Sequence, residues 1–382
     1  MNKLKVLELF GGIGACSKAL ERLGIDYEIA DYVEIDKYAV KSFNTMHGTN
    51  FEPQDICKWD KDIEVDLIMH GSPCQDFSLA GKQKGGDEGS GTRSSLMYET
   101  IRIVEKLKPK YVIWENVKNV ISKKHKHNYD NYCNKMSELG YISYGKVLNA
   151  KDYGIPQNRE RVFTISIRKD LEQTFEFPPK QELKLKLKDM LEDNADEKYY
   201  LSEKMVNFFY KNEQVQKEKG NGFRFGVSDG NVIAKAVTTR AGGRMDDNFI
   251  KIKNATKKGY LEAQAGQKEM IQTLTTQNNL GVCVIGGIGE KKSNGGTQWY
   301  QQDRVYDNNI GLSLSTCANP YYPDNQFRIR KLTPCECWRL MGFDDEDFEK
   351  AEKVNSNTQL YKQAGNSIVV NVLEEILKEL LC

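Results

Sequence analysis

No long hydrophobic run occurs in this sequence of 382 residues. A membrane-spanning helix needs about 20 consecutive, mainly apolar residues, so the sequence predicts no transmembrane segment. The N-terminal MNKLKVLELFGGIG contains only a short apolar run, without a cleavage-site pattern. We interpret it as a first strand rather than a signal peptide, and we expect the protein to stay in the cytoplasm.

Zinc-type cysteine spacing is also missing. The chain has nine cysteines, and their one close pair, Cys335 and Cys337, has neither the two-residue gap nor the second ligand pair of a zinc site. We therefore expect free thiols in a reducing compartment and no bound metal. The net charge of +1 excludes a strongly basic or acidic chain, so an anionic partner must be held by a local patch.

A dinucleotide-binding fingerprint with three glycines is absent as well, which counts against a nicotinamide or flavin cofactor. The sequence has instead one glycine turn, FGGIG (10–14), between a strand pattern and a helix pattern. Glu34 ends the next strand pattern, where an acid can bond ribose hydroxyls. Together these features predict an adenosine-containing cofactor, although the turn alone could be purely structural. Asp55 and Ile56 follow at a third turn and could bracket an adenine ring, although a lone aspartate there is more often a helix cap.

Strand and helix patterns alternate in the N-terminal half of the chain. This alternation predicts an α/β fold with a doubly wound, mostly parallel sheet. Ligands of such sheets bind beyond the carboxyl ends of the strands. Phe10, Glu34, residues 71–74 and Glu115 all fall at expected strand ends, so we expect them to share one edge. The expected strands cover residues 4–10, 27–34, 65–71, 111–117 and 161–167.

The composition changes after about residue 180, where glycine and small polar residues become frequent and helical periodicity fades. Three segments share an apolar and hydroxyl-rich core, at 233–243, 271–279 and 310–320. We interpret them as short strands that end in polar loops. Either a true repeat or ordinary strand composition explains the likeness. The last residues, 364–382, return to an amphipathic helix pattern suited to docking on the first domain.

Cys74 directly follows Pro73 and precedes a glycine-rich segment. Free cysteines usually pack in the interior, but this one follows a strand end and lies outside any apolar periodic face. A reactive thiolate needs positive or hydrogen-bonding neighbours. Glu115, Arg159 and Arg161 are candidates for that role. The alternatives are an inert buried thiol beside a surface loop, and a solvated charged edge for the two arginines.

Six motifs in order resemble the characteristic set of the cytosine-5 DNA methyltransferases, of the bacterial or phage restriction-modification type. Their order and spacing follow the family's unpermuted arrangement, and they cover nearly all of residues 1–179 and 330–382. One such motif would be weak evidence, whereas six in order are highly specific. The motifs are FGGIG (10–14), GSPCQDFS (71–78), ENV (115–117), QNRER (157–161), RKLTPCECWRLMGF (330–343) and GNSIVV (365–370).

The resemblance implies the fold of S-adenosylmethionine-dependent methyltransferases, with a second, smaller, mainly β target-recognition domain. We expect a catalytic and cofactor-binding domain at 1–179 plus 364–382. The target-recognition domain is expected at 180–363, including the motif at 330–343. The resemblance also implies a monomer that acts on nucleoid DNA in a bacterial cell, with or without a cognate restriction endonuclease for the same site.

The resemblance assigns the reaction to Cys74, Glu115, Arg159 and Arg161. The Cys74 thiolate would add to carbon 6 of cytosine, so that carbon 5 can take the methyl group of S-adenosylmethionine and leave S-adenosylhomocysteine. Glu115 would bond ring nitrogen 3 and the exocyclic amine, and Arg161, with Arg159 supporting, would contact the oxygen at position 2. The base must first be flipped out of the duplex, and the glycine-rich loop would close over it.

The resemblance also implies the binding residues. Ile35 stands where many family members carry an aromatic side chain that stacks on adenine, so some stacking is lost. The expected cofactor residues are Phe10, Gly11, Gly12, Ile13, Gly14, Glu34, Ile35, Asp55, Ile56, Pro73, Asn366 and Ser367. The expected DNA-binding residues are Gln75, Ser78, Lys82, Lys84, Arg93, Arg224, Arg240, Arg244 and Arg304. Among these, Arg240 and Arg244 flank the AGG turn and are the expected base readers, because arginine pairs bidentately with guanine.

Three other functions are possible on the sequence. A tRNA cytosine-5 methyltransferase of the same superfamily would have a compact recognition region, whereas here a long region separates RVFTISI from RKLTP. A nicotinamide-dependent oxidoreductase would not explain Cys74, Glu115 and the arginine pair. A catalytically dead DNA-binding regulator would not need an intact nucleophile and acid. Double-stranded DNA is therefore the expected partner, and no membrane.

Overall fold

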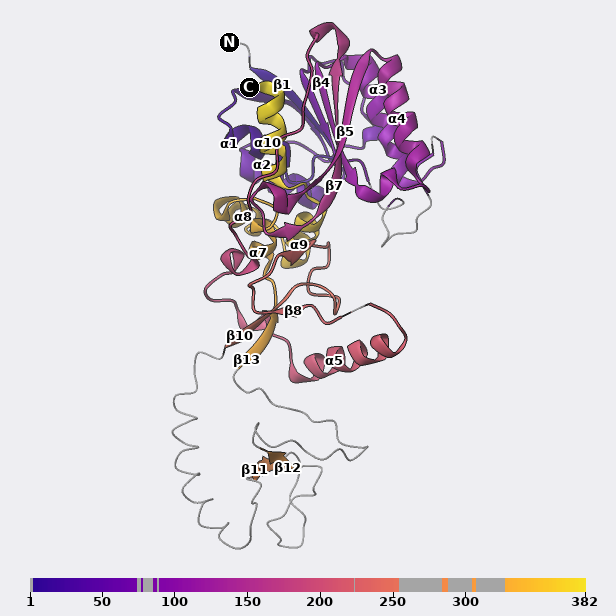
Figure 1. The fold of residues 1–382 in the computed structure, drawn as a ribbon. Coiled ribbons are helices and arrows are strands. Elements are labelled where there is room, and N and C mark those ends of the chain that lie inside the picture. The colour runs from indigo at the N-terminus through magenta and orange to yellow at the C-terminus, as the bar shows by residue number, and fades with distance from the viewer. Residues whose placement is uncertain are drawn as a thin grey trace, which may run out of the picture. The chain divides into compact units, whose positions relative to one another are not determined.

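The computed structural model describes residues 3–73, 77, 85–87, 89–222, 224–253, 284–287, 304–306 and 327–382. The chain divides into two compact units, Met1–Lys251 with Ile329–Cys382, and Ile252–Arg328. In Figure 1 the first unit holds both the indigo N-terminal strands and the yellow C-terminal helix. Among the helices within the described ranges, none is long and apolar enough to cross a membrane.

A six-stranded sheet of order β2-β1-β3-β4-β7-β5 forms the centre of the first unit. β1 pairs in parallel with β2 and β3, and β3 pairs in parallel with β4. The expected mostly parallel α/β sheet is therefore confirmed. The strands are β1 (Leu4–Leu9), β2 (Tyr27–Val33), β3 (Leu67–His70), β4 (Tyr111–Val117), β5 (Tyr141–Asn149) and β7 (Glu160–Arg168).

One strand, β7, runs antiparallel to both of its neighbours, β4 and β5. The chain returns from β5 to β7 through residues 150–159, which contain no α-helix. A parallel neighbour needs a crossover connection of a dozen or more residues, usually a helix, so this short link requires the reversal. Neither the reversal nor β5 was among the expectations from the strand patterns.

Helices cover both faces of the sheet, as a doubly wound architecture requires. On one face lie α3 (Met97–Leu107) and α4 (Lys126–Glu138), on the other α1 (Ala15–Arg22), α2 (Lys37–His47) and α10 (Val370–Leu381) (Figure 1). Because both faces are buried, the central strands are nearly continuous apolar runs rather than alternating ones. All four residues of β3 are buried.

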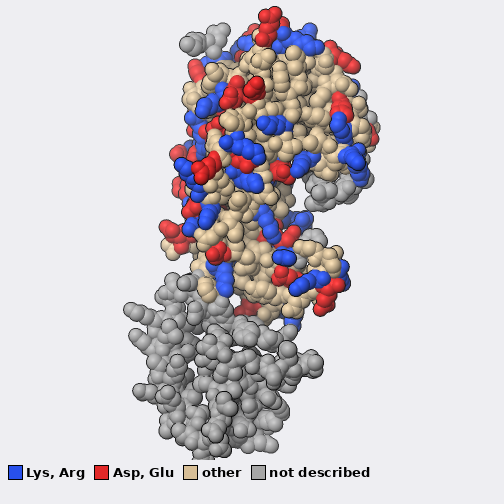
Figure 2. All heavy atoms as spheres, viewed as in Figure 1, with Lys and Arg blue, Asp and Glu red and all other residues tan. Residues whose placement is uncertain are grey.

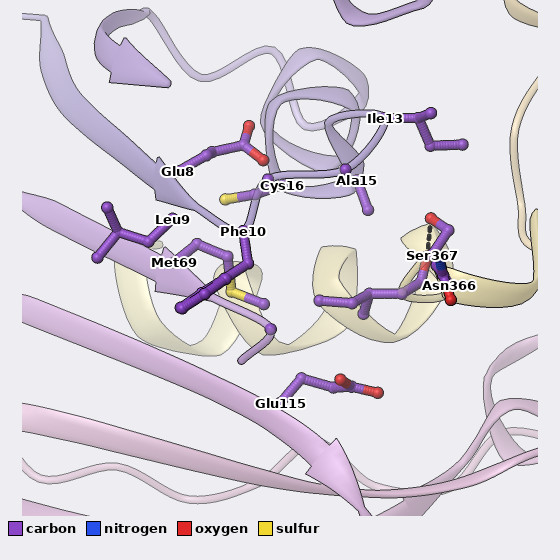
Figure 3. Close-up of a pocket in the computed structure, with 14 residues that line it drawn as sticks. Glu8, Leu9, Phe10, Ile13, Ala15, Cys16, Met69, Glu115, Asn366 and Ser367 are labelled. Atoms are coloured by element: carbon purple, nitrogen blue, oxygen red, sulfur yellow. Dashed lines mark hydrogen bonds between the residues drawn. The ribbon is translucent and has the colours of Figure 1, made fainter. Parts of the chain in front are cut away.

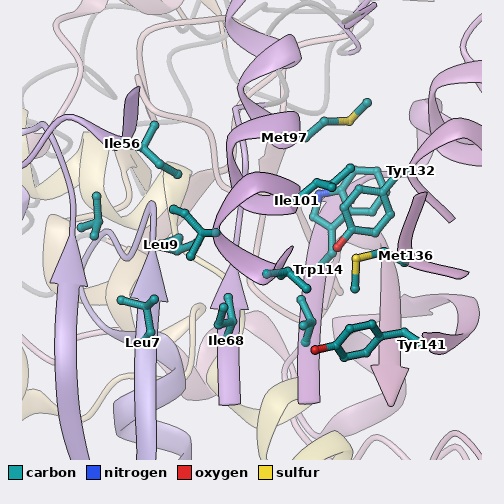
Figure 4. Packing of buried hydrophobic residues seen from close by; sticks show 14 of the residues in the cluster. Leu7, Leu9, Ile56, Ile68, Met97, Ile101, Trp114, Tyr132, Met136 and Tyr141 are labelled. Atoms are coloured by element: carbon teal, nitrogen blue, oxygen red, sulfur yellow. The ribbon is translucent and has the colours of Figure 1, made fainter. Parts of the chain in front are cut away.

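The main hydrophobic core lies between the sheet and the pair α3 and α4. Met97 and Ile101 of α3, with Tyr132 and Met136 of α4, belong to one buried cluster with Trp114 of β4 (Figure 4). The Tyr132 ring lies 4.2 Å from the Trp114 ring, measured between centroids. This packing fixes the position of β4, whose carboxyl end carries the ENV motif.

The motif at 330–343 forms β13 (Phe327–Lys331) and α7 (Pro334–Arg339). Thr333 caps α7 in a capping box with Glu336. Glu336 also forms an ion pair with the fully buried Arg330, with 2.6 Å between Nη2 and Oε1. This motif and residues 180–251 lie in the same compact unit as residues 1–179. The boundaries between the compact units thus differ from those expected for the two domains, and that domain division stays a prediction.

Smaller elements complete the described chain. A three-stranded sheet of order β13-β10-β8 packs with α5 around Phe209, Phe225, Phe249 and Ile329. Of the three repeat-like segments, only 233–243 lies in the described residues, and it contains the short strand β9. The remaining elements are β6 (Gln157–Asn158), α5 (Glu203–Glu218), β8 (Val227–Ser228), β9 (Ala234–Lys235), β10 (Phe249–Lys253), β11 (Val284–Gly287), β12 (Arg304–Tyr306), α8 (Asp345–Glu352) and α9 (Asn357–Asn366).

Candidate active site

A pocket opens where β1, β3 and β4 end at one edge of the sheet (Figure 3). Its empty space of about 410 Å³ includes solvent at its open side. Its walls come from segments far apart in the sequence: the glycine turn, the ends of β3 and β4, and residues 366–368 before α10. The lining residues are Glu8, Leu9, Phe10, Gly11, Gly12, Ile13, Ala15, Cys16, Met69, Gly71, Glu115, Asn366, Ser367 and Ile368.

The glycine turn exposes its backbone to this pocket. Phe10, which is not a glycine, has a positive φ of 52°, and such strained conformations cluster at ligand sites. Gly12 has φ +56°, and a Cβ placed there would meet nothing within 4 Å. The backbone at Gly12 is therefore open to a ligand at the start of α1. The helix start adds partial positive charge at this point.

The end of β2 is tied to the same turn. The Glu34 carboxylate accepts hydrogen bonds from the backbone N–H groups of Gly12 at 3.1 Å and Asp36 at 2.8 Å. Burial raises the pKa of Glu34, and the two backbone donors oppose that shift. The next residue, Ile35, is 70% exposed. This exposed isoleucine, next to a carboxylate that bonds the glycine turn, leaves an apolar surface open beside that turn.

The third turn, at Asp55 and Ile56, has structural partners. Asp55 caps the short helix Ile56–Lys58 by accepting a 3.0 Å bond from the N–H of Cys57. Ile56 is buried in the main core. The backbone N–H of Gln54 donates to the Glu34 carbonyl at 2.8 Å, so this turn lies beside the end of β2. The helix cap considered from the sequence is present, and a cofactor role for this turn stays a prediction.

The structure brings part of the expected cofactor set into the pocket. Phe10, Gly11, Gly12, Ile13, Asn366 and Ser367 line it, whereas Gly14, Glu34, Ile35, Asp55, Ile56 and Pro73 do not. Glu8, Cys16, Met69 and Ile368 line the pocket and were not expected. The alternation of β1 alone would have placed Glu8 on the face opposite to Leu7 and Leu9, but nothing in the sequence showed that this face meets the pocket.

Glu8 is a buried carboxylate in the pocket wall, 2% exposed. One of its oxygens accepts bonds from the backbone N–H of Ser17, at 2.9 Å, and from the Ser17 hydroxyl. Burial raises the pKa of Glu8 to about 7, and the Ser17 bonds limit the rise. This acid therefore changes its charge near neutral pH within the pocket.

Glu115 and Arg161 form an ion pair at the β4 side of the pocket. Arg161 Nε lies 2.9 Å from Glu115 Oε1. Burial raises the pKa of Glu115, while the positive charges of Arg161 and Arg159 lower it, and the net direction is upward. When it holds a proton, this carboxyl group can donate it to a ring nitrogen.

Arg159 is only 4% exposed, so it is not part of a solvated charged edge, which was the alternative for the two arginines. Its guanidinium donates to the carbonyl oxygens of Val237 at 3.1 Å, Gly365 at 3.0 Å and Ser367 at 2.8 Å. Arg161 is partly exposed and faces Glu115. The two arginines of QNRER therefore have different partners, although both charges act on Glu115.

Comparison with known proteins decides the family. The family model of C-5 cytosine-specific DNA methylases matches residues 4–382. The chain belongs to this family. It is 36% identical to the orphan methyltransferase M.SPRI of Bacillus phage SPR, covering 100% of this chain and 98% of the relative. It is 32% identical to the type II methyltransferase M.HhaI of Haemophilus parahaemolyticus, covering 98% and 93%.

A solved structure supports the fold. A mutant of the DNMT2 protein of Spodoptera frugiperda aligns with a TM-score of 0.64 at 20% identity, over 100% of both chains. The protein is thus a DNA (cytosine-5-)-methyltransferase with homologues in type II restriction-modification systems. These findings favour the DNA enzyme over the tRNA enzyme and the nicotinamide oxidoreductase.

In this methyltransferase, the strand end before Pro73 is held by β4. Ser72 Oγ accepts a 3.0 Å bond from Trp114 Nε1, and the Ser72 carbonyl accepts a 3.3 Å bond from Asn116 Nδ2. Beyond Pro73, the fully buried Phe77 has its carbonyl bonded by Asn119 Nδ2 at 2.5 Å. Cys74 itself lies outside the described residues, but the chain on both sides of it is anchored to β4 and the turn that follows.

The expected DNA-binding residues divide into two groups. Arg93, Arg224, Arg240 and Arg244 are described and exposed, whereas Gln75, Ser78, Lys82, Lys84 and the Arg304 side chain lie outside the described residues. In Figure 2 blue and red side chains are mixed over the coloured part of this face, without a continuous field of one sign. The net charge of +1 agrees with this mixture, and the DNA-binding roles of these residues stay predictions.

Proposed function

We propose that this methyltransferase modifies cytosine within a specific sequence of double-stranded DNA, with Cys74 as nucleophile, Glu115 as acid and Arg161 as its partner. The observation that carries the assignment is the 2.9 Å pair between Arg161 Nε and Glu115 Oε1. Glu115 lines the same pocket as the glycine turn. A base that reaches Glu115 would therefore meet the reactive group of a ligand held at that turn.

The chemistry requires activation of the base, because carbon 5 of cytosine is a weak nucleophile. Addition of the Cys74 thiolate to carbon 6 gives carbon 5 enamine character. Glu115, whose pKa is raised by burial, donates its proton to ring nitrogen 3 and so favours the addition. Once carbon 5 carries the methyl group, loss of its proton, expulsion of the thiolate and return of the nitrogen 3 proton to Glu115 release 5-methylcytosine and restore Cys74.

S-adenosylmethionine is the proposed methyl donor, and when bound it supplies an electrophilic methyl group. The open backbone at Gly12 and the strained Phe10 would hold its methionine part. Glu34, fixed by the N–H of Gly12, would hold the ribose hydroxyls, and the exposed Ile35 would cover the adenine. Asn366 and Ser367 would close the far wall.

Access to the target carbon requires base flipping, since carbon 6 and carbon 5 cannot be reached in a stacked duplex. Lost pairing and stacking cost a few kcal/mol, which phosphate contacts by basic side chains would offset. Arg240 and Arg244 are proposed as base readers in the major groove. The enzyme is proposed to act as a monomer on nucleoid DNA in the cytoplasm, with or without a partner endonuclease.

The proposed function is tested by replacing the proposed nucleophile. Cys74→Ser should abolish transfer of labelled methyl groups to DNA, because a hydroxyl is a far poorer nucleophile near neutral pH, while S-adenosylhomocysteine should still bind. Wild-type protein should form a denaturant-resistant adduct on DNA that carries 5-fluorocytosine at the target, since fluorine cannot leave as a proton does. Bisulfite sequencing of DNA from an expressing strain supplies the target sequence.

Cys57→Ser is the matched control, because Cys57 is an exposed cysteine of the same unit, and it should methylate and form the adduct like wild type. Full methylation by Cys74→Ser would overturn the assignment of the nucleophile. Methyl transfer to tRNA, with none to DNA, would overturn the proposed substrate.

A further inference from the structure

The QNRER motif is a junction between three distant segments of the chain. Gln157, fully buried, accepts a 2.8 Å bond at Oε1 from the backbone N–H of Val237 and donates through Nε2 to the Leu340 carbonyl at 2.6 Å. Its strand β6 also pairs in parallel with β9, opposite Ala234. Gln157 thereby joins the first repeat-like segment to the chain just after α7.

Arg159 completes the hold on Val237. Its Nη1 donates to the Val237 carbonyl, while its Nη2 donates to the carbonyls of Gly365 and Ser367. Both backbone polar groups of Val237 are therefore satisfied by side chains of one motif. Buried charge-assisted bonds of this kind are the stronger ones, and they are costly to leave unmade. The guanidinium holds the repeat-like segment and the pocket wall at Ser367 in one arrangement.

A close backbone contact reinforces this junction. A Cβ built on Gly365, in the last turn of α9, would lie 2.3 Å from the backbone N of Thr239 and 2.4 Å from the carbonyl carbon of Thr238. Side chains essentially never approach backbone atoms so closely, so a glycine is required there. The end of α9 therefore packs directly against the backbone of Thr238 and Thr239, which precede Arg240.

We propose that Arg159 and Gly365 are positioning residues that couple DNA binding at residues 238–244 to cofactor binding at residues 366–368. The inference rests on the proposed function, which places Arg240 and Arg244 on DNA and Ser367 beside the cofactor. One guanidinium bonds both segments and one glycine packs them together. A shift of either segment on binding its ligand therefore changes the geometry offered to the other ligand, which is the requirement for coupling.

The decisive experiment uses Gly365→Ala as a wedge. The dissociation constant of S-adenosylhomocysteine is measured for the full-length protein, alone and with a saturating duplex that carries the bisulfite-determined site. In wild type, the duplex should tighten cofactor binding by about fivefold or more, the lower range of measured couplings. In Gly365→Ala this factor should fall to within about twofold of one. The same factor should govern DNA affinity with and without S-adenosylhomocysteine, because coupling is reciprocal.

Two further variants make the result specific. Gly222→Ala is the control, because a Cβ there meets nothing within 4 Å and the backbone needs no positive φ; it should keep the wild-type factor. Arg159→Lys keeps the charge but cannot bond three carbonyls in the planar geometry of a guanidinium. It should therefore also reduce the coupling factor to within about twofold of one. This variant tests the proposal if Gly365→Ala does not fold.

Each outcome decides the proposal. An unchanged coupling factor in folded Gly365→Ala or Arg159→Lys, or a wild type without coupling, would overturn it. These failures differ from a failure of the proposed function, in which wild-type protein transfers no methyl groups to DNA. A wild type that methylates DNA but shows no dependence on the junction would retain its function and lose only this inference.

Discussion

Arg161 reaches Glu115 diagonally across the antiparallel pair β4 and β7. Glu115 stands opposite Phe163 in the register, and Arg161 stands opposite Val117, two residues further along β4. The 2.9 Å bond between Arg161 Nε and Glu115 Oε1 therefore depends on the reversed direction of β7. This relationship places an acid of raised pKa in the pocket wall beside a positive charge.

Removal of this arginine should shift the pH dependence of turnover. Burial raises the pKa of Glu115 and Arg161 opposes the rise, so Arg161→Ala should raise that pKa further. Because Glu115 is proposed to act in its protonated form, the alkaline limb of the kcat profile should move to higher pH, although kcat itself should fall. Measurement of kcat between about pH 5 and pH 9 tests this. Arg168→Ala, further along β7, is the control, and an unmoved limb in Arg161→Ala would contradict the pairing.

Replacement of the acid should separate catalysis from binding. Glu115→Gln removes the proton donor while it keeps the size of the side chain, so turnover should fall by about 10²- to 10⁴-fold. DNA affinity, measured by titration with cognate duplex, should change by less than about tenfold, or ~1.4 kcal/mol. A larger loss of affinity would show that Glu115 acts as a structural residue.

Cofactor affinity should respond to the side chain after Glu34. Ile35 is 70% exposed, so a larger ring fits there without disturbing the core. Ile35→Phe should tighten S-adenosylhomocysteine binding by about two- to tenfold, because stacking on adenine adds about 0.5–1.5 kcal/mol. Calorimetric titration measures the dissociation constant of S-adenosylhomocysteine. Ile142→Phe, at a 45% exposed position on β5, should have no effect, and an equal gain there would remove the argument for Ile35.

The two exposed arginines that flank the AGG turn, Arg240 and Arg244, should separate base reading from phosphate binding. As base readers, Arg240→Ala and Arg244→Ala should each cost about 1–3 kcal/mol on the cognate duplex and relax preference at one position. Both variants are titrated on cognate and singly substituted duplexes at two salt concentrations. If both variants instead bind every duplex equally more weakly, and their affinity depends less steeply on salt concentration, these arginines contact phosphates.

The buried acid of β1 should make stability depend on pH. Burial, limited by Ser17, raises the pKa of Glu8 to about 7, whereas glutamate in an unfolded chain titrates near ~4.3. The unfolded chain binds fewer protons between these values, so wild-type stability falls as the pH rises through this window. Glu8→Gln keeps an acceptor for Ser17 and should raise the free energy of unfolding by up to about 4 kcal/mol at pH 8.

Urea unfolding at about pH 5 and about pH 8 tests this dependence. The gain from Glu8→Gln should be clearly smaller at the lower pH, where the native carboxyl is already protonated. Glu105→Gln, at an exposed position of α3, is the matched control. An equal gain at both pH values would show that packing rather than ionisation is responsible.

Much of the active-site edge could be predicted from the sequence. The strand patterns at 4–10, 27–34 and 111–117 correspond to β1, β2 and β4 within a residue or so. These are local signals, because buried parallel strands need apolar runs and the turn after β1 needs glycine at a positive φ. Once strands alternate with helices, the carboxyl ends of parallel strands must meet at one edge. The placing of Phe10 and Glu115 at one pocket follows from that rule.

The sequence by itself therefore determined the family, the α/β sheet and the polar residues at its edge. The tertiary structure alone decided the direction of β7, the entry of Glu8 into the pocket, and the division of labour between Arg159 and Arg161. These features depend on tertiary structure because packing of distant segments, and not the neighbouring residues in the sequence, determines which groups a buried polar side chain contacts. The carbonyls that bind Arg159 belong to Val237, Gly365 and Ser367, and no pattern around residue 159 can specify acceptors so distant along the chain.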